Sequence, residues 1–210
     1  MQSVKNLSVK QLRRRIYEIS YKNKLSHIGS CISCVSIIDR IYKKKKEHET
    51  FCLGSSHAAL ALYVILEKFY GFDANDLYKR HGTHANRSLE DKIYVTGGSL
   101  GLVETIALGI AVAKPNERVF LLSSDGATTE GVIWETLRFK SDNNINNLKW
   151  FINCNSLGAY SYIDTDILEE RVHCFDKSVK IVRTSNKLPF CEGLNSHYHI
   201  MSEEDYQKIK

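Results

Sequence analysis

Apolar residues recur at helical spacing in two segments near the start of the chain. In residues 8–24 the apolar positions fall three or four apart from Val9 to Ile19, and Ser8 is a candidate N-cap. Residues 31–42 repeat this spacing. We therefore expect two amphipathic helices before the first strand, joined by a polar loop over residues 26–30.

Short, almost unbroken apolar runs further along the chain are typical of strands buried on both faces of a sheet. They alternate with segments of helical pattern, which is the order expected of a parallel sheet crossed by helices. The sequence thus predicts one α/β domain over residues 1–210, with helices on both faces of a parallel sheet. The expected strands are 50–53, 118–123, 148–153 and 178–184, and the expected helices are 57–70, 74–80, 100–113, 130–140 and 166–175.

Composition adds constraints without changing this picture. Apolar residues make up 43% of the chain, charged residues 25%, and the formal net charge is +5, which is ordinary for a globular protein. The basic run 43–46 is typical of the exposed end of a helix rather than of a basic surface that binds nucleic acid. No segment has the composition of a signal peptide or the apolar length of a membrane span. We expect a cytoplasmic protein with reduced cysteines and no nucleic-acid or membrane partner.

Two predicted strands end in residues with hard oxygen donors. Asp125 follows the strand 118–123 and Asn155 follows the strand 148–153, with one helix between them. A strand–helix–strand crossover places such strands side by side, so the two side chains could converge on a divalent cation such as Mg²⁺. The alternative is structural: Asp125 could cap the following helix and Asn155 could fill a tight turn.

A glycine-rich segment, 96–101 (T-G-G-S-L-G), precedes a predicted apolar helix. Free backbone N–H groups and the positive end of the helix dipole make this a natural phosphate site. The segment is neither a dinucleotide fingerprint nor a Walker A loop, and glycine-rich helix starts also serve close packing. By itself this signal is weak.

Several motifs, in order along the chain, resemble those of the transketolase family. Asp125-Gly126 with Asn155 thirty positions later resembles its thiamine-diphosphate motif. The other matching segments are 26–30 (S-H-I-G-S), 56–63 (S-H-A-A-L-A-L-Y), 98–101 (G-S-L-G), 130–135 (E-G-V-I-W-E) and 196–206. The resemblance covers nearly the whole chain and implies the thiamine-diphosphate-binding fold, here shortened between Asn155 and His197.

The resemblance implies a role for each matching residue. Asp125, Asn155 and the backbone carbonyl of Leu157 would hold Mg²⁺. Thiamine diphosphate would contact a separate cofactor-binding set of residues. Four histidines would carry catalysis, together with Glu130, which would lie at a subunit interface. The cofactor-binding set is His57, Gly98, Ser99, Leu100, Ser124, Asp125, Gly126, Asn155 and His197, and the catalytic histidines are His27, His57, His84 and His197. Histidines with near-neutral pKa values would suit proton handling.

Family members also need a second domain, which is absent from these 210 residues. The resemblance therefore implies a subunit of a split transketolase, inactive alone, which transfers a two-carbon ketol unit between sugars. Its partner would carry the pyrimidine-binding and C-terminal domains, and the assembly would be a dimer of heterodimers. A subunit of a condensing enzyme similar to 1-deoxyxylulose-phosphate synthase is an alternative, as is a non-catalytic scaffold that keeps the fold.

Some positions depart from the family pattern or suggest other chemistry. Ser56 and Ser124 replace glycines, and Leu102-Val103 replaces Gln-Gly; all three changes add bulk close to the expected diphosphate. The pair Cys31-x-x-Cys34 could bind a metal or act in redox chemistry, but its spacing fits one apolar helix face. Zinc sites at residues 81–84 or 197–199 lack an obvious third ligand.

Overall fold

The computed structural model describes residues 7–158, 160–185 and 187–209. Its helices are α1 (Val9–Lys22), α2 (Ile28–Tyr42), α3 (Ala59–Tyr70), α4 (Ala74–His81), α5 (Leu102–Ala113), α6 (Gly131–Asp142), α7 (Thr165–Phe175) and α8 (Glu203–Gln207). Its strands are β1 (Thr50–Leu53), β2 (Val119–Ser124), β3 (Leu148–Cys154) and β4 (Lys180–Arg183). Short 3₁₀ turns occur at η1 (Ser56–Ala58), η2 (Gly126–Thr129) and η3 (Leu194–His197).

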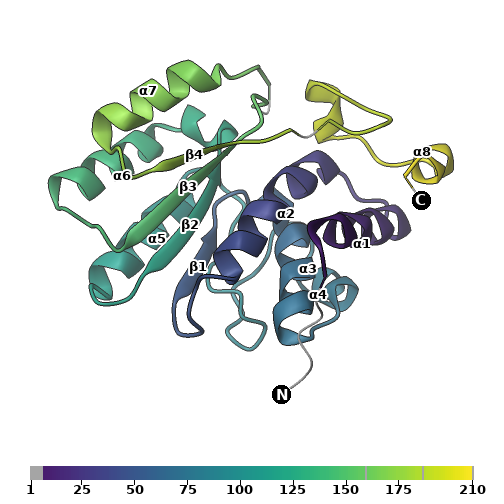
Figure 1. The fold of residues 1–210 in the computed structure, drawn as a ribbon, viewed down its shortest axis with the longest axis horizontal. Coiled ribbons are helices and arrows are strands. Elements are labelled where there is room, and N and C mark those ends of the chain that lie inside the picture. Colours follow the sequence, from purple (N-terminus) through teal and green to yellow (C-terminus); the bar gives the residue numbers. More distant parts are fainter. Residues whose placement is uncertain (1–6, 159, 186, 210) are drawn as a thin grey trace.

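The described strands form one parallel sheet in the order β1-β2-β3-β4. Helices α1–α4 lie on one side of this sheet and α5–α7 on the other (Figure 1). Phe51 and Leu53 pack into the core on the α1–α4 side, whereas Cys52 between them packs into the core on the α5–α7 side. This alternation follows from the two-residue period of a strand. The predicted α/β class with a parallel sheet covered on both sides is confirmed.

Local signals placed several helix boundaries correctly. Ser8 caps α1, and its side chain forms a capping box with Gln11. Asp73 caps α4 by accepting a hydrogen bond from the backbone N–H of Asp76.

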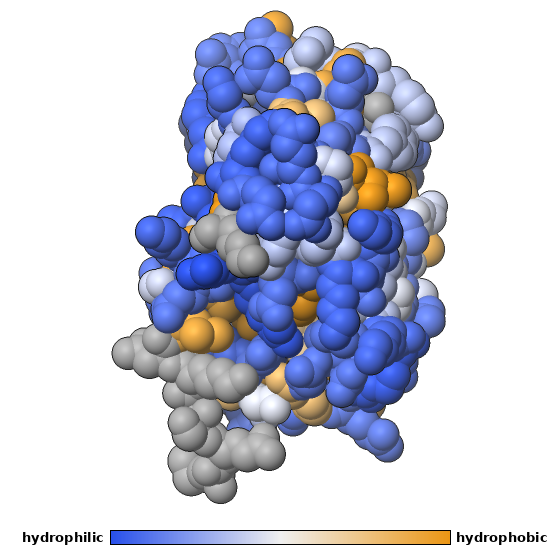
Figure 2. Space-filling view, turned by 90° about the vertical axis from the view of Figure 1, so that its right-hand side faces the viewer, coloured by the Kyte–Doolittle hydropathy of each residue, from blue (hydrophilic) through white to orange (hydrophobic). Residues whose placement is uncertain are grey.

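On the side of the molecule shown in Figure 2, hydrophilic residues predominate. None of the helices in the described ranges has the length and hydropathy needed to cross a bilayer.

Three predicted helix starts were wrong by two or more residues. Helix α3 begins at Ala59 rather than His57, after the 3₁₀ turn η1, and the other two errors lie at left-handed residues. Helix α2 begins at Ile28, inside the expected loop, because His27 takes up the left-handed conformation (φ 62°) and allows the helix to start directly after it. Helix α5 begins at Leu102 rather than Leu100, because Gly101 (φ 82°) interrupts the helical geometry. A β-carbon on Gly101 would lie 2.4 Å from Val132 Cγ1, so close packing also requires glycine there.

The cysteine pair in α2 serves the core. Cys31 is 3% exposed and Cys34 is 0% exposed, and both pack against α3 residues of the same apolar cluster. Burial raises the pKa of the Cys31 thiol to about 12, which removes its thiolate at neutral pH. The expected packing role is confirmed.

His81 belongs to the pair 81–84 that the sequence analysis considered as a possible zinc site. Its ring contacts Asp91 (Nε2 to Oδ2, 2.7 Å).

Candidate active site

The carboxyl ends of β2 and β3 lie side by side, as the crossover pattern predicts. Val119–Ser124 pairs in parallel with Leu148–Asn153, residue by residue. The backbone N–H of Asp125 continues this ladder by donating to the carbonyl of Asn153 (3.0 Å). Asp125 and Asn155 therefore leave adjacent strands at the same edge of the sheet, where ligands of open α/β sheets bind.

The Asp125 carboxylate joins the two strand ends. Its Oδ2 accepts from the backbone N–H groups of Asn155 (2.9 Å) and Ser156 (2.7 Å), and its Oδ1 accepts from that of Gly126 (3.0 Å). Asp125 is 0% exposed, and burial raises its pKa to about 6, although these three N–H groups act in the opposite direction. A carboxylate offers about four lone-pair positions, so at least one remains for a cation.

Asn155 and Leu157 complete the set of oxygen donors. The Oδ1 of Asn155 accepts from the backbone N–H of Leu157 (3.0 Å), which folds this segment into a tight turn. The Leu157 carbonyl oxygen lies 4.0 Å from the position that a β-carbon on Gly126 would occupy. Both side chains therefore have the structural role considered above, Asp125 as the cap of η2 and Asn155 in a tight turn. With the Leu157 carbonyl they also form a cluster of one carboxylate, one amide and one carbonyl, a donor set that suits Mg²⁺.

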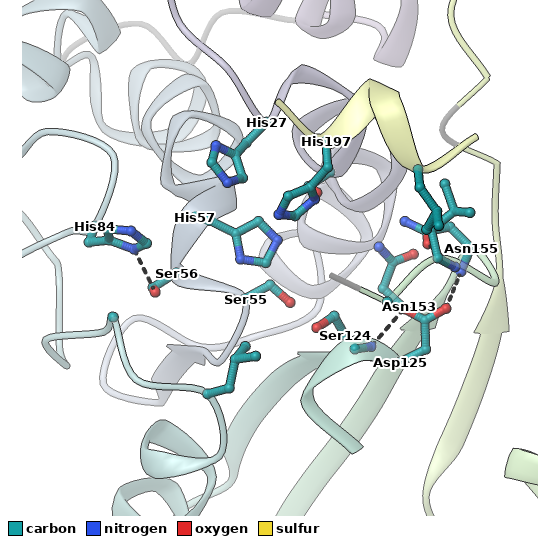
Figure 3. A pocket seen from close by; sticks show the side chains of 17 residues that line it. His27, Ser55, Ser56, His57, His84, Ser124, Asp125, Asn153, Asn155 and His197 are labelled. Carbon is teal, nitrogen blue, oxygen red and sulfur yellow. Dashed lines mark hydrogen bonds between the residues drawn. The ribbon is translucent and has the colours of Figure 1, made fainter. Parts of the chain in front are cut away.

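A cavity of about 170 Å³ opens beside this cluster (Figure 3). It is smaller than the ~300–1,000 Å³ of a complete small-molecule site, so it can enclose only part of a cofactor. Most of the predicted site residues line it: His27, His57, His84, Gly98, Leu100, Ser124, Asp125, Gly126, Asn155, Leu157 and His197. Ser99 and Glu130 are exposed and are not among the residues that line it.

Three of the histidines form one cluster above the cavity, although they come from distant parts of the chain. The ring centroids of His27 and His197 are 4.4 Å apart, and each lies 5.4 Å from that of His57. The backbone N–H of His27 donates to the carbonyl of His197 (3.0 Å), which fixes η3 against the start of α2. The left-handed backbone of His27 is strained for a residue other than glycine, and such strain is common at functional sites.

The environment of these imidazoles differs from the sequence-based expectation of near-neutral pKa values. Burial, helped by the neighbouring histidines, lowers the pKa of His57 to about 3 and that of His27 to about 4. Burial also lowers the pKa of His197. The rings are thus neutral at pH 7 and can donate and accept hydrogen bonds there, as a bound polar substrate requires.

The bulkier residues at the family's glycine positions are accommodated. Ser56 packs against Gly97, where a β-carbon would lie only 2.2 Å from Ser56 Cβ, and its hydroxyl hydrogen-bonds His84 Nδ1 (3.1 Å). Ser124 Oγ accepts from the backbone N–H of Ala127 (3.2 Å) and so stabilises the turn η2. Leu102 is 51% exposed and Val103 lies in the core, and neither lines the cavity. Ser56 and Ser124 line the cavity, so the bulk expected close to the diphosphate is limited to these two serines, and the expectation for Leu102-Val103 was wrong.

Sequence reasoning missed Ser55. Its hydroxyl is buried, lines the cavity and has no hydrogen-bond partner among the described residues. Buried polar atoms are nearly always paired, so this hydroxyl indicates a missing ligand or water. Ser55 follows the carboxyl end of β1, and the rule applied to β2 and β3 would have found it. Asn153 also lines the cavity, but Ser33 and Thr184 already hold its side-chain amide (2.8 and 2.6 Å).

The residues present fit a magnesium-bound diphosphate. Gly98 has a φ of 142°, and a β-carbon there would meet nothing within 4 Å, so a ligand can approach its backbone closely. Within the described residues, no group of three or more His, Cys, Asp or Glu side chains could hold a metal ion. The cluster at Asp125 is of another kind, with one carboxylate and neutral oxygens, and it leaves coordination positions for phosphate oxygens and water.

An acid-titration experiment tests the burial of neutral His57. Because its pKa is lowered from 6.5 to about 3, the unfolded chain binds the extra proton first as the pH falls below 6.5, and stability is lost. We expect the unfolding free energy of His57→Asn to fall less steeply between pH 7 and 5, by at most about 1.4 kcal/mol per pH unit. Buried Asp125 has the opposite effect on the unfolding free energy below pH 6, but it is present in both the wild type and His57→Asn. The difference in slope between these two proteins therefore reports on His57 alone.

Urea unfolding followed by circular dichroism at each pH provides the measurement. His48→Asn, at an exposed position, is the matched control and should show the wild-type slope. Equal slopes for His57→Asn and the wild type would show that His57 is not held neutral by burial.

Comparisons with known proteins agree with the resemblance of the motifs. The chain is 29% identical over 176 residues to one of the subunits of apulose-4-phosphate transketolase from Phocaeicola vulgatus, covering 75% of this chain and 60% of that protein. It is 25% identical over 172 residues to 6-deoxy-6-sulfo-D-fructose transketolase subunit SqwG from Clostridium sp., covering 72% and 62% respectively. Identity to 1-deoxy-D-xylulose-5-phosphate synthase from Fusobacterium nucleatum is 22% over 180 residues, covering 84% of this chain and 28% of that protein.

Solved structures share the fold. A transketolase variant from Pichia stipitis superposes on 97% of this chain and 40% of its own, with a TM-score of 0.76 and 16% identity. No protein-family model matches the sequence. The chain spans about 60% of the length of the two transketolase subunits and a smaller share of the larger enzymes.

Proposed function

Because the chain belongs to the transketolase family and corresponds to the N-terminal domain of its members, we propose that it is the thiamine-diphosphate- and Mg²⁺-binding subunit of a split transketolase-like enzyme. The observation that carries this proposal is the meeting of Asp125, Asn155 and the Leu157 carbonyl at one wall of a cavity that Gly98 and four histidines also line. The reaction proposed is the transfer of a two-carbon ketol unit between sugars in the cytoplasm.

Each group has a role that follows from its position. Asp125, Asn155 and the Leu157 carbonyl would hold Mg²⁺, and the backbone at Gly98 to Leu100, with Ser124 and Gly126, would surround the diphosphate. The Ser55 hydroxyl would donate its free hydrogen bond into the cavity. When bound, thiamine diphosphate supplies the carbanion chemistry that breaks and forms the carbon–carbon bond.

The histidine cluster would serve the sugar. His27, His57 and His197 are neutral at pH 7 and converge on one wall of the cavity, so they can orient sugar hydroxyls and exchange protons with them. His84, held by the Ser56 hydroxyl, lies nearer the solvent and would contact the same substrate. Glu130, which is exposed, would act only in an assembly, at the interface with the partner.

The small volume of the cavity supports the need for a partner chain. The cavity has room for the diphosphate end, and the remaining part of the cofactor would extend beyond it. We propose that a second subunit, with pyrimidine-binding and C-terminal domains, completes the site, and that two such pairs associate. The names of the two transketolase-subunit relatives support this arrangement.

Calorimetric titration with thiamine diphosphate tests the proposal. We expect saturable binding to the chain together with its partner, and loss of that binding when EDTA removes Mg²⁺. Ketol transfer should require both chains. A condensing enzyme would instead consume a 2-oxo acid and release carbon dioxide. A complex that forms but shows no saturable cofactor binding would contradict the proposal and favour the scaffold alternative.

A further inference from the structure

The sheet face on the α1–α4 side is left partly uncovered. Helices α1–α4 cover β1 and β2 on this side, and Phe51, Leu53 and Leu122 there are at most 5% exposed. On β3 and β4 the residues facing the same way, Phe151 and Val182, are only half-buried. Parallel sheets normally have both faces covered, so this half of the face lacks a layer.

A groove of about 1170 Å³ lies between α2 and strands β3 and β4 and extends around the β4 edge of the sheet, where Trp150 and α7 residues Glu169 and His173 also line it. Its apolar floor includes Ile37 and Ile41 of α2 together with Phe120, Phe151 and Val182 of the sheet. We call it the α2–β4 groove. A helix about 10 Å wide that rises 1.5 Å per residue fills about 120 Å³ per residue, so the groove corresponds to at most about ten residues, or roughly three turns.

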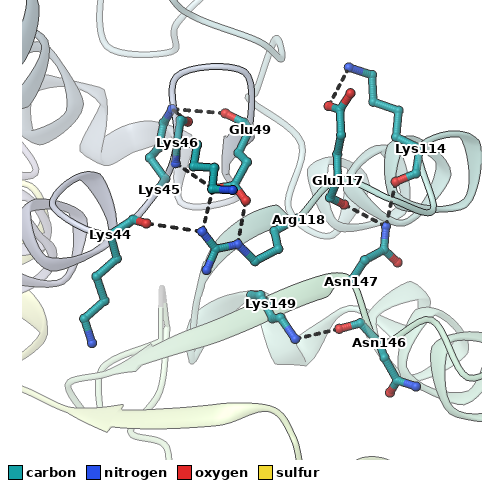
Figure 4. Close-up of polar contacts among 10 residues, drawn as sticks. All are labelled: Lys44, Lys45, Lys46, Glu49, Lys114, Glu117, Arg118, Asn146, Asn147 and Lys149. Atoms are coloured by element: carbon teal, nitrogen blue, oxygen red, sulfur yellow. Dashed lines mark hydrogen bonds and ion pairs between the residues drawn. The ribbon is translucent and has the colours of Figure 1, made fainter.

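Both rims of the α2–β4 groove are basic. Arg40 and Lys44 lie on the α2 side, and Lys149 and Lys180 project from the sheet face that carries Phe151 and Val182, with the Lys180 ammonium 5.5 Å from the centroid of the Phe151 ring. All four are exposed, and no ion pair with a carboxylate is found for any of them among the described residues. Figure 4 shows the Lys44 ammonium directed away from the polar contacts of its neighbours.

Two arginines that line the groove are already paired with carboxylates. Arg118 donates to both carboxylate oxygens of Glu49 (2.5 and 2.9 Å; Figure 4), and Arg183 pairs with Asp166 and Glu169. The unpaired charge that remains around the apolar floor is therefore positive. A ligand complementary to this surface has an apolar stripe flanked by carboxylates.

We propose that the α2–β4 groove is a docking site for an acidic amphipathic helix of another protein chain. Leucine-like side chains of that helix would cover Phe151 and Val182, and its carboxylates would pair with the cations on both rims, as in other helix-in-groove complexes. Lys44, Arg118 and Lys149 lie near the amino ends of the strands, whereas the cavity beside Asp125 lies at their carboxyl ends. The inference therefore does not rest on the proposed cofactor site.

Fluorescence anisotropy with a labelled synthetic helix tests the inference on the full chain. The probe is a peptide of about 14 residues with leucines at i, i+3, i+4 and i+7 and glutamates on both sides of that stripe. We expect saturable binding that weakens at about 0.3 M salt, where charges are screened beyond ~6 Å. The double variant Lys149→Glu/Lys180→Glu should bind at least about tenfold more weakly.

The matched control is Lys10→Glu/Lys22→Glu, which makes the same change of charge at exposed positions of α1 and should bind as the wild type does. A scrambled peptide of identical composition should bind at least about tenfold more weakly, since it lacks the apolar stripe. Equal binding of the scrambled peptide, or an equal loss in both double variants, would reduce the effect to general attraction of anions and overturn the inference.

Absence of binding to the designed peptide would also overturn it. So would self-association of the chain that Lys149→Glu/Lys180→Glu abolishes in light scattering, because the groove would then hold a second copy. Thiamine diphosphate binding should be the same in both double variants and the wild type, so failure here is distinguishable from failure of the cofactor proposal.

Discussion

Asp125→Asn is expected to weaken Mg²⁺-dependent binding of thiamine diphosphate by at least about 100-fold, or roughly 2.7 kcal/mol. The substitution removes the one negative charge among the proposed metal ligands while keeping the size of the side chain. Calorimetry on the complex with the partner chain provides the measurement, with and without Mg²⁺. Without Mg²⁺, neither the variant nor the wild type should show saturable binding.

The asparagine variant is preferable to alanine because of the structural role of Asp125. Its carboxylate accepts hydrogen bonds from the backbone N–H groups of Gly126, Asn155 and Ser156, and alanine would remove the acceptor of all three. Asp142→Asn, at an exposed position that ends α6, is the matched control and should bind the cofactor normally. An unchanged affinity in Asp125→Asn, with the fold intact by circular dichroism, would refute the assignment of the metal site.

Asp39→Ala is expected to lower the free energy of unfolding by about 3–5 kcal/mol. Asp39 is 1% exposed and accepts from the ammonium of Lys68 (2.6 Å), which is itself only 4% exposed. The same ammonium donates to the carbonyl of Leu7 (2.7 Å), so the pair joins the start of α1 to α2 and α3. Removing Asp39 leaves a buried, unpaired positive charge, which is the costly outcome.

Urea denaturation measures this loss. Lys43→Ala removes the exposed partner of Asp39 and should cost no more than about 1 kcal/mol, as surface ion pairs do. The double variant Asp39→Leu/Lys68→Met replaces the buried pair by apolar groups and should recover most of the stability. If Asp39→Ala costs no more than Lys43→Ala, the buried ion pair is not what holds these helices together.

Much of the site could be predicted because its signals are local. Asp125 and Asn155 each follow an apolar strand, and a single intervening helix makes those strands neighbours, so the sequence predicts their approach. The glycine turn before α5 is visible for the same reason. The boundaries of α1 and α4 were also predictable, because capping residues act within one turn of the helix.

The rest depended on contacts between distant segments. His27 and His197 lie 170 positions apart, and only the packing of η3 against α2 brings their rings together. The lowered pKa values of the histidines result from burial that no motif reports, and the same holds for the pairing of Lys68 with Asp39, since a lone lysine in a helical pattern reads as exposed.

By itself, then, the sequence determined the order of the elements, the parallel sheet and the convergence of Asp125 with Asn155, because periodicity, capping and crossover geometry are properties of neighbouring residues. The tertiary structure alone decided which polar groups are desolvated, Ser55 and His57 among them, and which part of the sheet is left open at the α2–β4 groove. Both depend on what packs over each residue, and the covering atoms come from segments far away in the chain.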